Sequence, residues 1–286
     1  MNKVIIASDS TTDLSPELIE RYGVKILPLG VTLGEKQYID GVNITPEMIY
    51  EHYEEKGELP KTSAVNIGQF QEFYRQCAEE GDSVVMFTIS AQMSSTCNNA
   101  RLAAEDFENV YVVDTKNLST GGGLLLLAAC DMREEGKSAR EIAAECERLT
   151  DYVNASFVID DLEFLHKGGR CSALVRFGAN MLSLKPCIVV RDGKMSVGKK
   201  YRGKYLMTLK SYIADQIGDA SDIDLTRVFV THAGCDEAIV SACVDEVKRL
   251  APFGELFITR AGCTVSSHCG RNTLGVLFMR KTPFEV

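Results

Sequence analysis

The feature that most constrains the fold is an alternation along the chain. Short runs of apolar, β-forming residues follow stretches in which apolar residues recur at helical spacing. Two of the short runs, SVVMFTIS at 83–90 and VYVVDT at 110–115, are almost continuously apolar. Strands of this kind are covered on both faces, as in parallel sheets flanked by helices. We therefore predict an α/β fold with a mostly parallel sheet in the N-terminal half.

Helix start signals divide this half into elements. Ser-Pro at 15–16 and Thr-Pro at 45–46 each supply an N-cap followed by a first helical residue. Asn66 can cap a third helix, which ends near Gly81. On this interpretation residues 62–65 form the loop that enters the third helix.

The character of the sequence changes near residue 155. A helix-like stretch, SALVRFGANMLSL at 172–184, precedes an apolar run and an Asp192-Gly193 pair that is typical of a hairpin turn. Further strand-like and helical stretches then alternate. We predict two domains, an N-terminal α/β domain at 1–155 and a C-terminal α/β domain at 156–286.

Composition excludes several classes of function. The chain has 40 acidic and 31 basic residues and a net charge of −9, so it lacks the positive field that attracts nucleic acid. Its ten cysteines form no C-x-x-C pair, and its four histidines lie far apart. This pattern predicts reduced thiols, a cytoplasmic protein and no bound metal. The first apolar run is too short for a membrane span, so no integral membrane segment is expected.

Three glycines at 121–123 precede an apolar helical stretch and invite a nucleotide-binding interpretation. However, Leu126 stands where the pattern G-x-G-x-x-G needs its third glycine, and no G-x-x-x-x-G-K-[ST] sequence occurs. We expect these glycines to allow close packing of a helix. No cofactor is predicted.

Three polar stretches join apolar elements and could carry chemistry: Thr62-Ser63, Ser94-Ser95-Thr96 and the loop expected at 266–270, which contains His268. The first two are expected just before helices, where free N–H groups and the helix dipole favour a carboxylate or phosphate. Two interpretations remain open at this point. The hydroxyls either cap their own helices, with His268 a structural residue, or converge on one anion.

Read together, a series of short motifs resembles the DegV family over nearly the whole chain. The motifs are SDSTTDLS at 8–15, YIDGVNIT at 38–45, PKTSA at 60–64, ISAQMSST at 89–96, LEFLHKGGR at 162–170, KPCIVVRDGK at 185–194, KKYRGK at 199–204 and SHCG at 267–270. Each motif is unspecific alone, but their order and spacing identify the chain as a member of this family. Ser95 departs from the family pattern, which usually has glycine there.

The resemblance implies a two-domain α/β protein with a long-chain fatty acid between its domains. The family pattern places the carboxyl-binding residues at Thr62, with Ser63 beside it, at Ser94 and at His268. It further implies an acid-binding subunit without catalytic residues of its own. A separate ATP-dependent kinase subunit phosphorylates the held acid, and the acyl-phosphate feeds phospholipid synthesis. Such a role allows transient membrane contact for lipid exchange.

Two arginines have a structural and a functional interpretation each. Arg170 follows Gly168-Gly169 and is either a surface residue beyond a helix end or part of the site. Arg202 lies in a basic cluster with Lys199, Lys200 and Lys204. The cluster is either merely solvated or, as the resemblance implies, a contact for the kinase subunit.

Two other classes of function compete with this hypothesis. A stand-alone hydrolase or phosphotransferase could use Ser94 or Thr62 activated by His268, although the chain has no G-x-S-x-G and no obvious acidic partner for this histidine. A lipid carrier without a kinase partner is the third hypothesis. Turnover by the purified protein alone distinguishes the enzyme from the two binding proteins.

Overall fold

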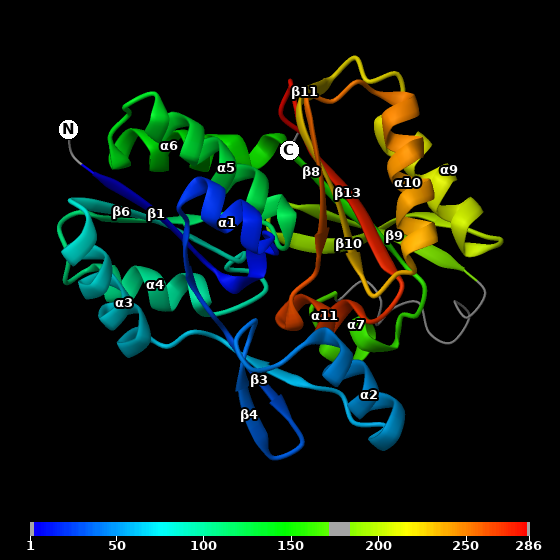
Figure 1. The fold of residues 1–286 in the computed structure, drawn as a ribbon, viewed down its shortest axis with the longest axis horizontal. Helices are drawn as coiled ribbons and strands as arrows, with labels where there is room; N and C mark the ends of the chain where they lie inside the picture. Colours follow the sequence, from blue (N-terminus) through cyan, green and yellow to red (C-terminus); the bar gives the residue numbers. More distant parts are fainter. Residues whose placement is uncertain (1–2, 172–183, 285–286) are drawn as a thin grey trace.

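The computed structural model describes residues 3–171 and 184–284, which form three sheets with helices packed around them (Figure 1). The helix expected at 172–184 therefore falls, except for its last residue, outside the described residues. Within the described ranges, no helix combines the length and the apolar composition that crossing a membrane requires.

The first sheet is parallel throughout, as the sequence predicts. Its strand order is β2-β1-β6-β7, and the strands span Val4–Asp9 (β1), Lys25–Leu27 (β2), Ser83–Thr88 (β6) and Val110–Asp114 (β7). Five helices accompany it: Pro16–Tyr22 (α1), Ile67–Glu80 (α3), Thr96–Ala104 (α4), Thr120–Glu134 (α5) and Ala139–Leu149 (α6). Helices α3 and α4 cover one face, and α5 and α6 cover the other.

The pleat of β1 explains why this strand is buried along its whole length. Ile5 and Ala7 pack with α3 and α4, whereas Val4 and Ile6 pack with α5 and α6. Successive side chains of a strand point to opposite faces, so a strand covered on both sides carries apolar residues on both. The two polar residues at the end of β1, Ser8 and Asp9, are buried with hydrogen-bond partners. The near-continuous apolar runs in the sequence reflect this arrangement.

The predicted helix caps are present. Ser15 accepts a hydrogen bond from the backbone N–H of Leu18, and Thr45 accepts one from Met48 at the start of α2 (Pro46–Lys56). Asn66 and Gln69 form a reciprocal capping box at the start of α3. The starts of these helices could be predicted because each signal is local.

The loop expected at 62–65 is partly a strand, which corrects the sequence interpretation. Lys61–Ser63 form β5, which pairs with β3 (Gly30–Leu33), and β3 also pairs with β4 (Lys36–Ile39). This small antiparallel sheet buries Val31 and Leu33 of β3. A three-residue strand is too short to show a period-two pattern, and its partner lies about thirty residues away.

The second sheet has six strands in the order β10-β9-β8-β13-β11-β12, and only β11 and β12 are parallel neighbours. Asp192 and Gly193 form the predicted hairpin turn, with φ of 45° and 76°. The strands are Val153–Ile159 (β8), Lys185–Arg191 (β9), Lys194–Tyr201 (β10), Ile223–Ala233 (β11), Glu255–Arg260 (β12) and Thr273–Arg280 (β13). The helices among the described residues of this half are Glu163–Gly168 (α7), Tyr205–Ile217 (α9), Glu237–Leu250 (α10) and Cys263–Cys269 (α11).

Helix α5 joins the two large sheets. One continuous apolar cluster contains its leucines at 124–127 together with residues of β1, β6, β8 and β9. A Cβ atom on Gly121 would lie 3.1 Å from the Cβ atom of Ala155, so the glycine lets α5 approach β8 closely. The proposed boundary between residues 155 and 156 falls inside β8, and the division into 1–155 and 156–286 stays a proposal.

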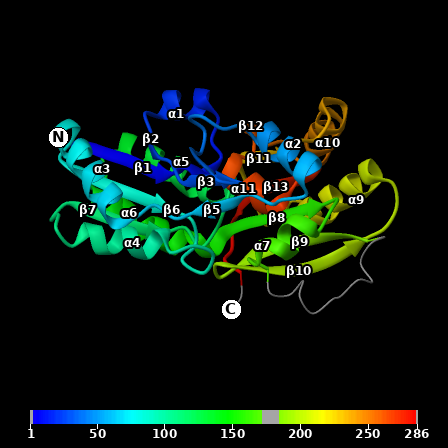
Figure 2. The ribbon, with the colours of Figure 1, turned by 90° about the horizontal axis from the view of Figure 1, so that it is seen from below.

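Strand β5 and helix α11 lie near the junction of the two halves in both views (Figures 1 and 2). They contact each other, and α11 also contacts α2, α7 and β3. Residues far apart in the sequence therefore meet at this junction.

Candidate functional site

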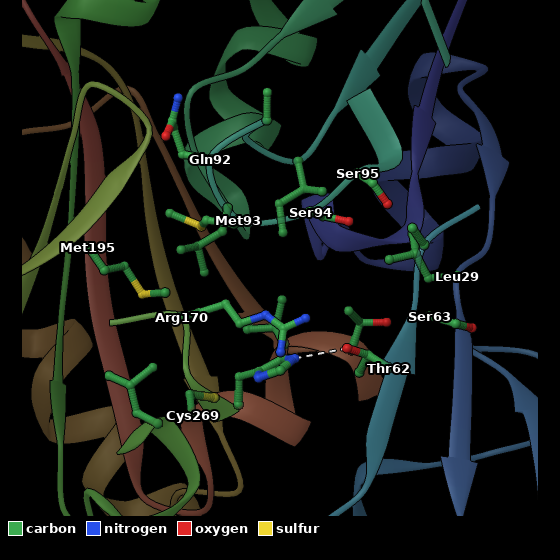
Figure 3. A pocket seen from close by; sticks show the side chains of 18 of the residues that line it. Leu29, Thr62, Ser63, Gln92, Met93, Ser94, Ser95, Arg170, Met195 and Cys269 are labelled. Atoms are coloured by element: carbon green, nitrogen blue, oxygen red, sulfur yellow. Dashed lines mark hydrogen bonds between the residues drawn. The ribbon is translucent and has the colours of Figure 1, made fainter. Parts of the chain in front are cut away.

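A cavity of about 480 Å³ opens at the junction between the two halves of the molecule (Figure 3). This volume lies within the range of ~300–1,000 Å³ that is usual for small-molecule sites. Its walls come from β5, from the segment that follows β6, and from α7, β8, β10 and α11. They comprise Leu29, Thr62, Ser63, Ala64, Ile89, Ala91, Gln92, Met93, Ser94, Ser95, Leu118, Phe157, Leu165, Arg170, Met195, Thr264, Val265, His268 and Cys269.

Two of the predicted site residues touch inside this cavity. The hydroxyl Oγ1 of Thr62 lies 2.9 Å from Nε2 of His268, although 206 residues separate them. The dashed line that ends at Thr62 in Figure 3 marks this hydrogen bond. Thr62 points into the cavity from β5, and His268 reaches it from the last turn of α11.

The imidazole of His268 is held neutral by its surroundings. Burial, assisted by the positive charge of Arg170, lowers the pKa of His268 to about 4. Its Nδ1 atom is buried and has no hydrogen-bond partner among the described residues. A Cβ atom on Gly168 would lie only 2.6 Å from that nitrogen, so the glycine leaves the ring its space. The ring therefore presents only its Nε2 edge to the cavity.

Ser94 lines the same cavity but makes different contacts. Its hydroxyl lies 2.9 Å from Oγ1 of Thr96 and accepts a hydrogen bond of 3.2 Å from the Thr96 N–H. Ser95, the N-cap residue of α4, makes no capping bond with its side chain. Ser63 also lines the cavity, although its hydroxyl lies close to Gly30 of β3. The Thr62–His268 pair thus joins the two halves inside the cavity, with Ser94 facing the same space.

The prediction of a loop at 266–270 is wrong, because residues 266–269 belong to helix α11 and Gly270 is its C-cap. The sequence offers no local cap for this helix, since Gly262 at the N-cap has no side chain. Its first N–H groups are bonded by carboxylates from distant parts of the chain, as described below. No local signal could have indicated them.

Arg170 gives the cavity its charge. Its guanidinium donates a hydrogen bond of 2.8 Å to the carbonyl of Gly168 and extends into the cavity on the side of Thr62 (Figure 3). Of the described residues that line the cavity, Arg170 alone is formally charged and none is a carboxylate. This balance favours an anionic group over a cation.

Arg202 does not belong to this site. It is an exposed residue between β10 and α9, outside the cavity lining. Lys199, in the same basic cluster, forms an ion pair of 2.6 Å with Asp215. Arg170 and Arg202 therefore occupy different places, one in the cavity and one on the surface.

A second, smaller cavity of about 40 Å³ adjoins the first on the side of the six-stranded sheet. The two cavities share four lining residues, Leu118, Phe157, Val265 and Cys269, which lie between them and are called the neck below. Small residues line the inner cavity, among them Ala155, Ala233, Ala261 and Gly275. The sequence did not single out these residues, because in a strand they look like any other core position.

The two halves also meet at the rim of the cavity. The hydroxyl of Ser90 donates a hydrogen bond of 2.8 Å to the carbonyl of Gly193 at the tip of the β9–β10 hairpin. A Cβ atom on Gly193 would lie 2.6 Å from that hydroxyl oxygen. This contact places Gln92 beside the hairpin, where Met195 also lines the cavity.

Comparison with known proteins agrees with this architecture. A DegV domain-containing protein from Clostridium acetobutylicum is 30% identical over 283 residues, which cover 98% of this chain and 100% of that protein. A DegV-family protein from Thermus thermophilus, whose structure was solved for its fatty-acid binding, is 32% identical with a TM-score of 0.86. The match covers 97% of this chain and 99% of that one.

A stearic acid-binding protein from Eubacterium ventriosum is similar as well, with 29% identity and a TM-score of 0.82 over 98% of this chain and 99% of that one. These matches bear out the mixed α/β fold. The family model described as "Uncharacterised protein, DegV family" matches residues 3–281. The chain therefore belongs to the DegV family.

Proposed function

We propose that this protein binds a long-chain fatty acid and presents its carboxyl group to a separate ATP-dependent kinase subunit. The acyl-phosphate formed there feeds phospholipid synthesis. The protein itself acts in the cytoplasm as a binding subunit and catalyses no reaction alone.

The observation that carries this proposal is the contact between Thr62 and His268 inside the cavity. When the neutral imidazole donates through Nε2 to Oγ1 of Thr62, the Thr62 hydroxyl is left to donate to a carboxyl group, which needs such a bond when it leaves water. Ser94 faces the same space with a third hydroxyl. Arg170 supplies the opposite charge without a competing carboxylate in the lining.

The remainder of the lining suits an apolar tail. Beyond the head-group residues, the neck residues Leu118, Phe157, Val265 and Cys269 line the cavity and also border the inner cavity. A tail kept from water there gains on the order of 25 cal/mol per Å² of its buried apolar surface. The DegV-family protein from Thermus thermophilus and the stearic acid-binding protein from Eubacterium ventriosum, both similar to this chain, support the same assignment.

The first test is to identify what the native protein carries. The protein is purified from a bacterial host under native conditions that keep bound lipid, and the lipid is then extracted. Mass spectrometry of the extract is expected to find about one fatty acid per chain, because an empty apolar cavity forfeits the free energy of burying the tail. Repeated extracts that contain no fatty acid would refute the proposal.

Substitution of the head-group residues tests the site itself. Each hydrogen bond to a charged group contributes roughly 1.5–3 kcal/mol, and ~1.4 kcal/mol corresponds to a factor of ten in affinity. Thr62→Val, Ser94→Ala and His268→Ala are therefore each expected to weaken fatty-acid binding by about tenfold or more. Binding is measured by titration of the lipid-free protein, with a melting curve for each variant.

Thr45→Val is the matched control for Thr62→Val. Thr45 caps α2 and does not line the cavity. It is expected to lower the melting temperature slightly and to leave binding unchanged. If the three site variants melt and bind like the parent protein, the carboxyl group is held elsewhere.

The transfer to a kinase has a separate test. With ATP alone the protein is expected to form no acyl-phosphate, and addition of the kinase subunit is expected to start the reaction. Arg202→Ala should slow this reaction while leaving bound lipid unchanged, because Arg202 is exposed and outside the cavity. Arg140, an exposed arginine of α6, provides the control substitution Arg140→Ala. Loss of lipid in Arg202→Ala would contradict its role as a partner contact.

A stand-alone hydrolase is less well supported by the geometry. In a catalytic triad, an acid orients the histidine through Nδ1. Here Nδ1 of His268 faces Gly168 and has no partner among the described residues. Nothing in the described part of the chain prepares this ring as a general base.

A further inference from the structure

The start of helix α11 is held by two carboxyl groups from the N-terminal part of the chain. Oδ1 of Asp13 accepts a hydrogen bond of 2.8 Å from the N–H of Gly262. The carboxylate of Asp40 accepts bonds of 2.8 and 3.1 Å from the N–H groups of Cys263 and Thr264. These bonds satisfy N–H groups that a helix start leaves without an internal partner.

Both carboxyl groups are themselves fixed in place. Asp40 also accepts a bond of 2.9 Å from the hydroxyl of Ser10, and Asp13 lies 2.5 Å from the hydroxyl of Ser119. Both side chains are almost fully buried, with exposed fractions of 6% for Asp13 and 3% for Asp40. The start of α11 is therefore anchored to rigid, buried parts of the other half.

The anchor lies close to the proposed head-group site but does not belong to it. Neither Asp13 nor Asp40 lines the cavity, so neither can touch a ligand there. His268 lies five residues after Cys263, and at 1.5 Å of rise per residue this separation is about 7–8 Å along the helix. Helix α11 is only seven residues long, is almost entirely buried and packs as one unit against α2, α7, β3 and β5. Any shift of its start is thus passed on to the imidazole.

We infer that Asp13 and Asp40 are positioning residues, which set the place of His268 against Thr62 by holding the first turn of α11. This inference rests on the proposed function of the Thr62–His268 pair. It goes beyond that function because it assigns a role to two carboxyl groups that touch no ligand.

The hydrogen bonds of the two carboxyl groups differ, which makes their roles separable. Asp40 accepts three hydrogen bonds, from the hydroxyl of Ser10 and from the N–H groups of Cys263 and Thr264. Asp13 accepts one bond on each oxygen, from the N–H of Gly262 and from the hydroxyl of Ser119. Asparagine at position 13 keeps an oxygen for the Gly262 N–H, and its amide can donate to the Ser119 oxygen. At position 40 it cannot reproduce three accepted bonds.

The test measures His268 itself, in full-length protein freed of lipid. The titration of its imidazole is followed by NMR and assigned with a His268→Gln variant. In Asp40→Ala and Asp13→Ala, the midpoint is expected to rise from about 4 by about one unit or more toward the ordinary value of 6.5, because a displaced ring gains access to water. Asp13→Asn is expected to keep the parent's midpoint, and Asp40→Asn is expected to shift it partly.

Ser138→Ala distinguishes a positioning role from a general loss of stability. Ser138 caps α6, a helix on the other side of the parallel sheet from α3 and α4, and takes no part in the hydrogen bonds that hold the start of α11. Its loss should lower the melting temperature without moving the His268 midpoint. Two outcomes would contradict the inference. In the first, Ser138→Ala moves the midpoint as far as Asp40→Ala does. In the second, Asp13→Ala and Asp40→Ala both fold and titrate like the parent. If Asp40→Ala does not fold, Asp40→Asn provides the measurement. Because no lipid is present, the result is independent of whether the cavity binds a fatty acid.

Discussion

At the scale of single residues, the proposed site depends on a glycine, Gly168, which has no side chain to occupy the space of the neighbouring imidazole. Gly168 ends α7 directly against the imidazole of His268. The ring can keep its Nε2 edge toward Thr62 because nothing projects from the α-carbon of this glycine. The position is thus constrained by space and not by backbone conformation, since its φ is not in the left-handed region.

Gly168→Ala tests this arrangement. The added Cβ atom would lie 2.6 Å from Nδ1, so the ring must move and the 2.9 Å bond to Thr62 should be lost. We expect fatty-acid binding to weaken by about tenfold, the loss of roughly one charge-assisted hydrogen bond. Gly68→Ala, near the start of α3, is the control because its nearest contact would be an ordinary 3.4 Å. Unchanged binding in Gly168→Ala would show that the ring has room to spare.

At the scale of elements, the sequence predicted those parts whose signals are local. Apolar runs predicted β6 and β7, and Ser-Pro and Thr-Pro pairs predicted the starts of α1 and α2. The hairpin at Asp192-Gly193 was predicted for the same reason. Each of these features is encoded within a few residues.

Elements stabilised by distant partners were missed. Strand β5 is stabilised by pairing with β3. The first turn of α11 is stabilised by hydrogen bonds to Asp13 and Asp40. For the site, the family pattern singled out Thr62 and His268, and their contact appears only when β5 and α11 meet. The neck and inner cavity could not be predicted, because Phe157 or Ala233 resembles any core residue in a strand.

At the scale of the whole molecule, buried acids link stability to pH. Burial raises the pKa of Asp13 from 3.8 to about 8. Between these values the folded chain binds more protons at this residue than the unfolded chain, so the free energy of unfolding falls as pH rises. His268 acts in the opposite direction, but only between about 4 and 6.5, because its pKa is lowered. Above pH 6.5 the contribution of Asp13 is therefore separate from that of His268.

Asp13→Asn should remove this contribution, because an amide does not ionise. From pH 6.5 to 8 the free energy of unfolding of the parent is expected to fall relative to the variant by up to ~1.4 kcal/mol per pH unit. Urea unfolding at several pH values gives both curves, and other titrating groups cancel in the difference. Parallel curves over this range would mean that Asp13 is already ionised in the folded protein.

The last strand of the six-stranded sheet, β13, lies between β8 and β11, and α11 directly precedes it in the chain. During synthesis on the ribosome, Thr62 and Ser94 emerge long before His268 and before the strand that joins β8 to β11. A nascent chain therefore has neither a closed second sheet nor a complete head-group site until α11 and β13 have left the exit tunnel. A fragment that ends before α11 therefore lacks His268, and with it the head-group site that we propose.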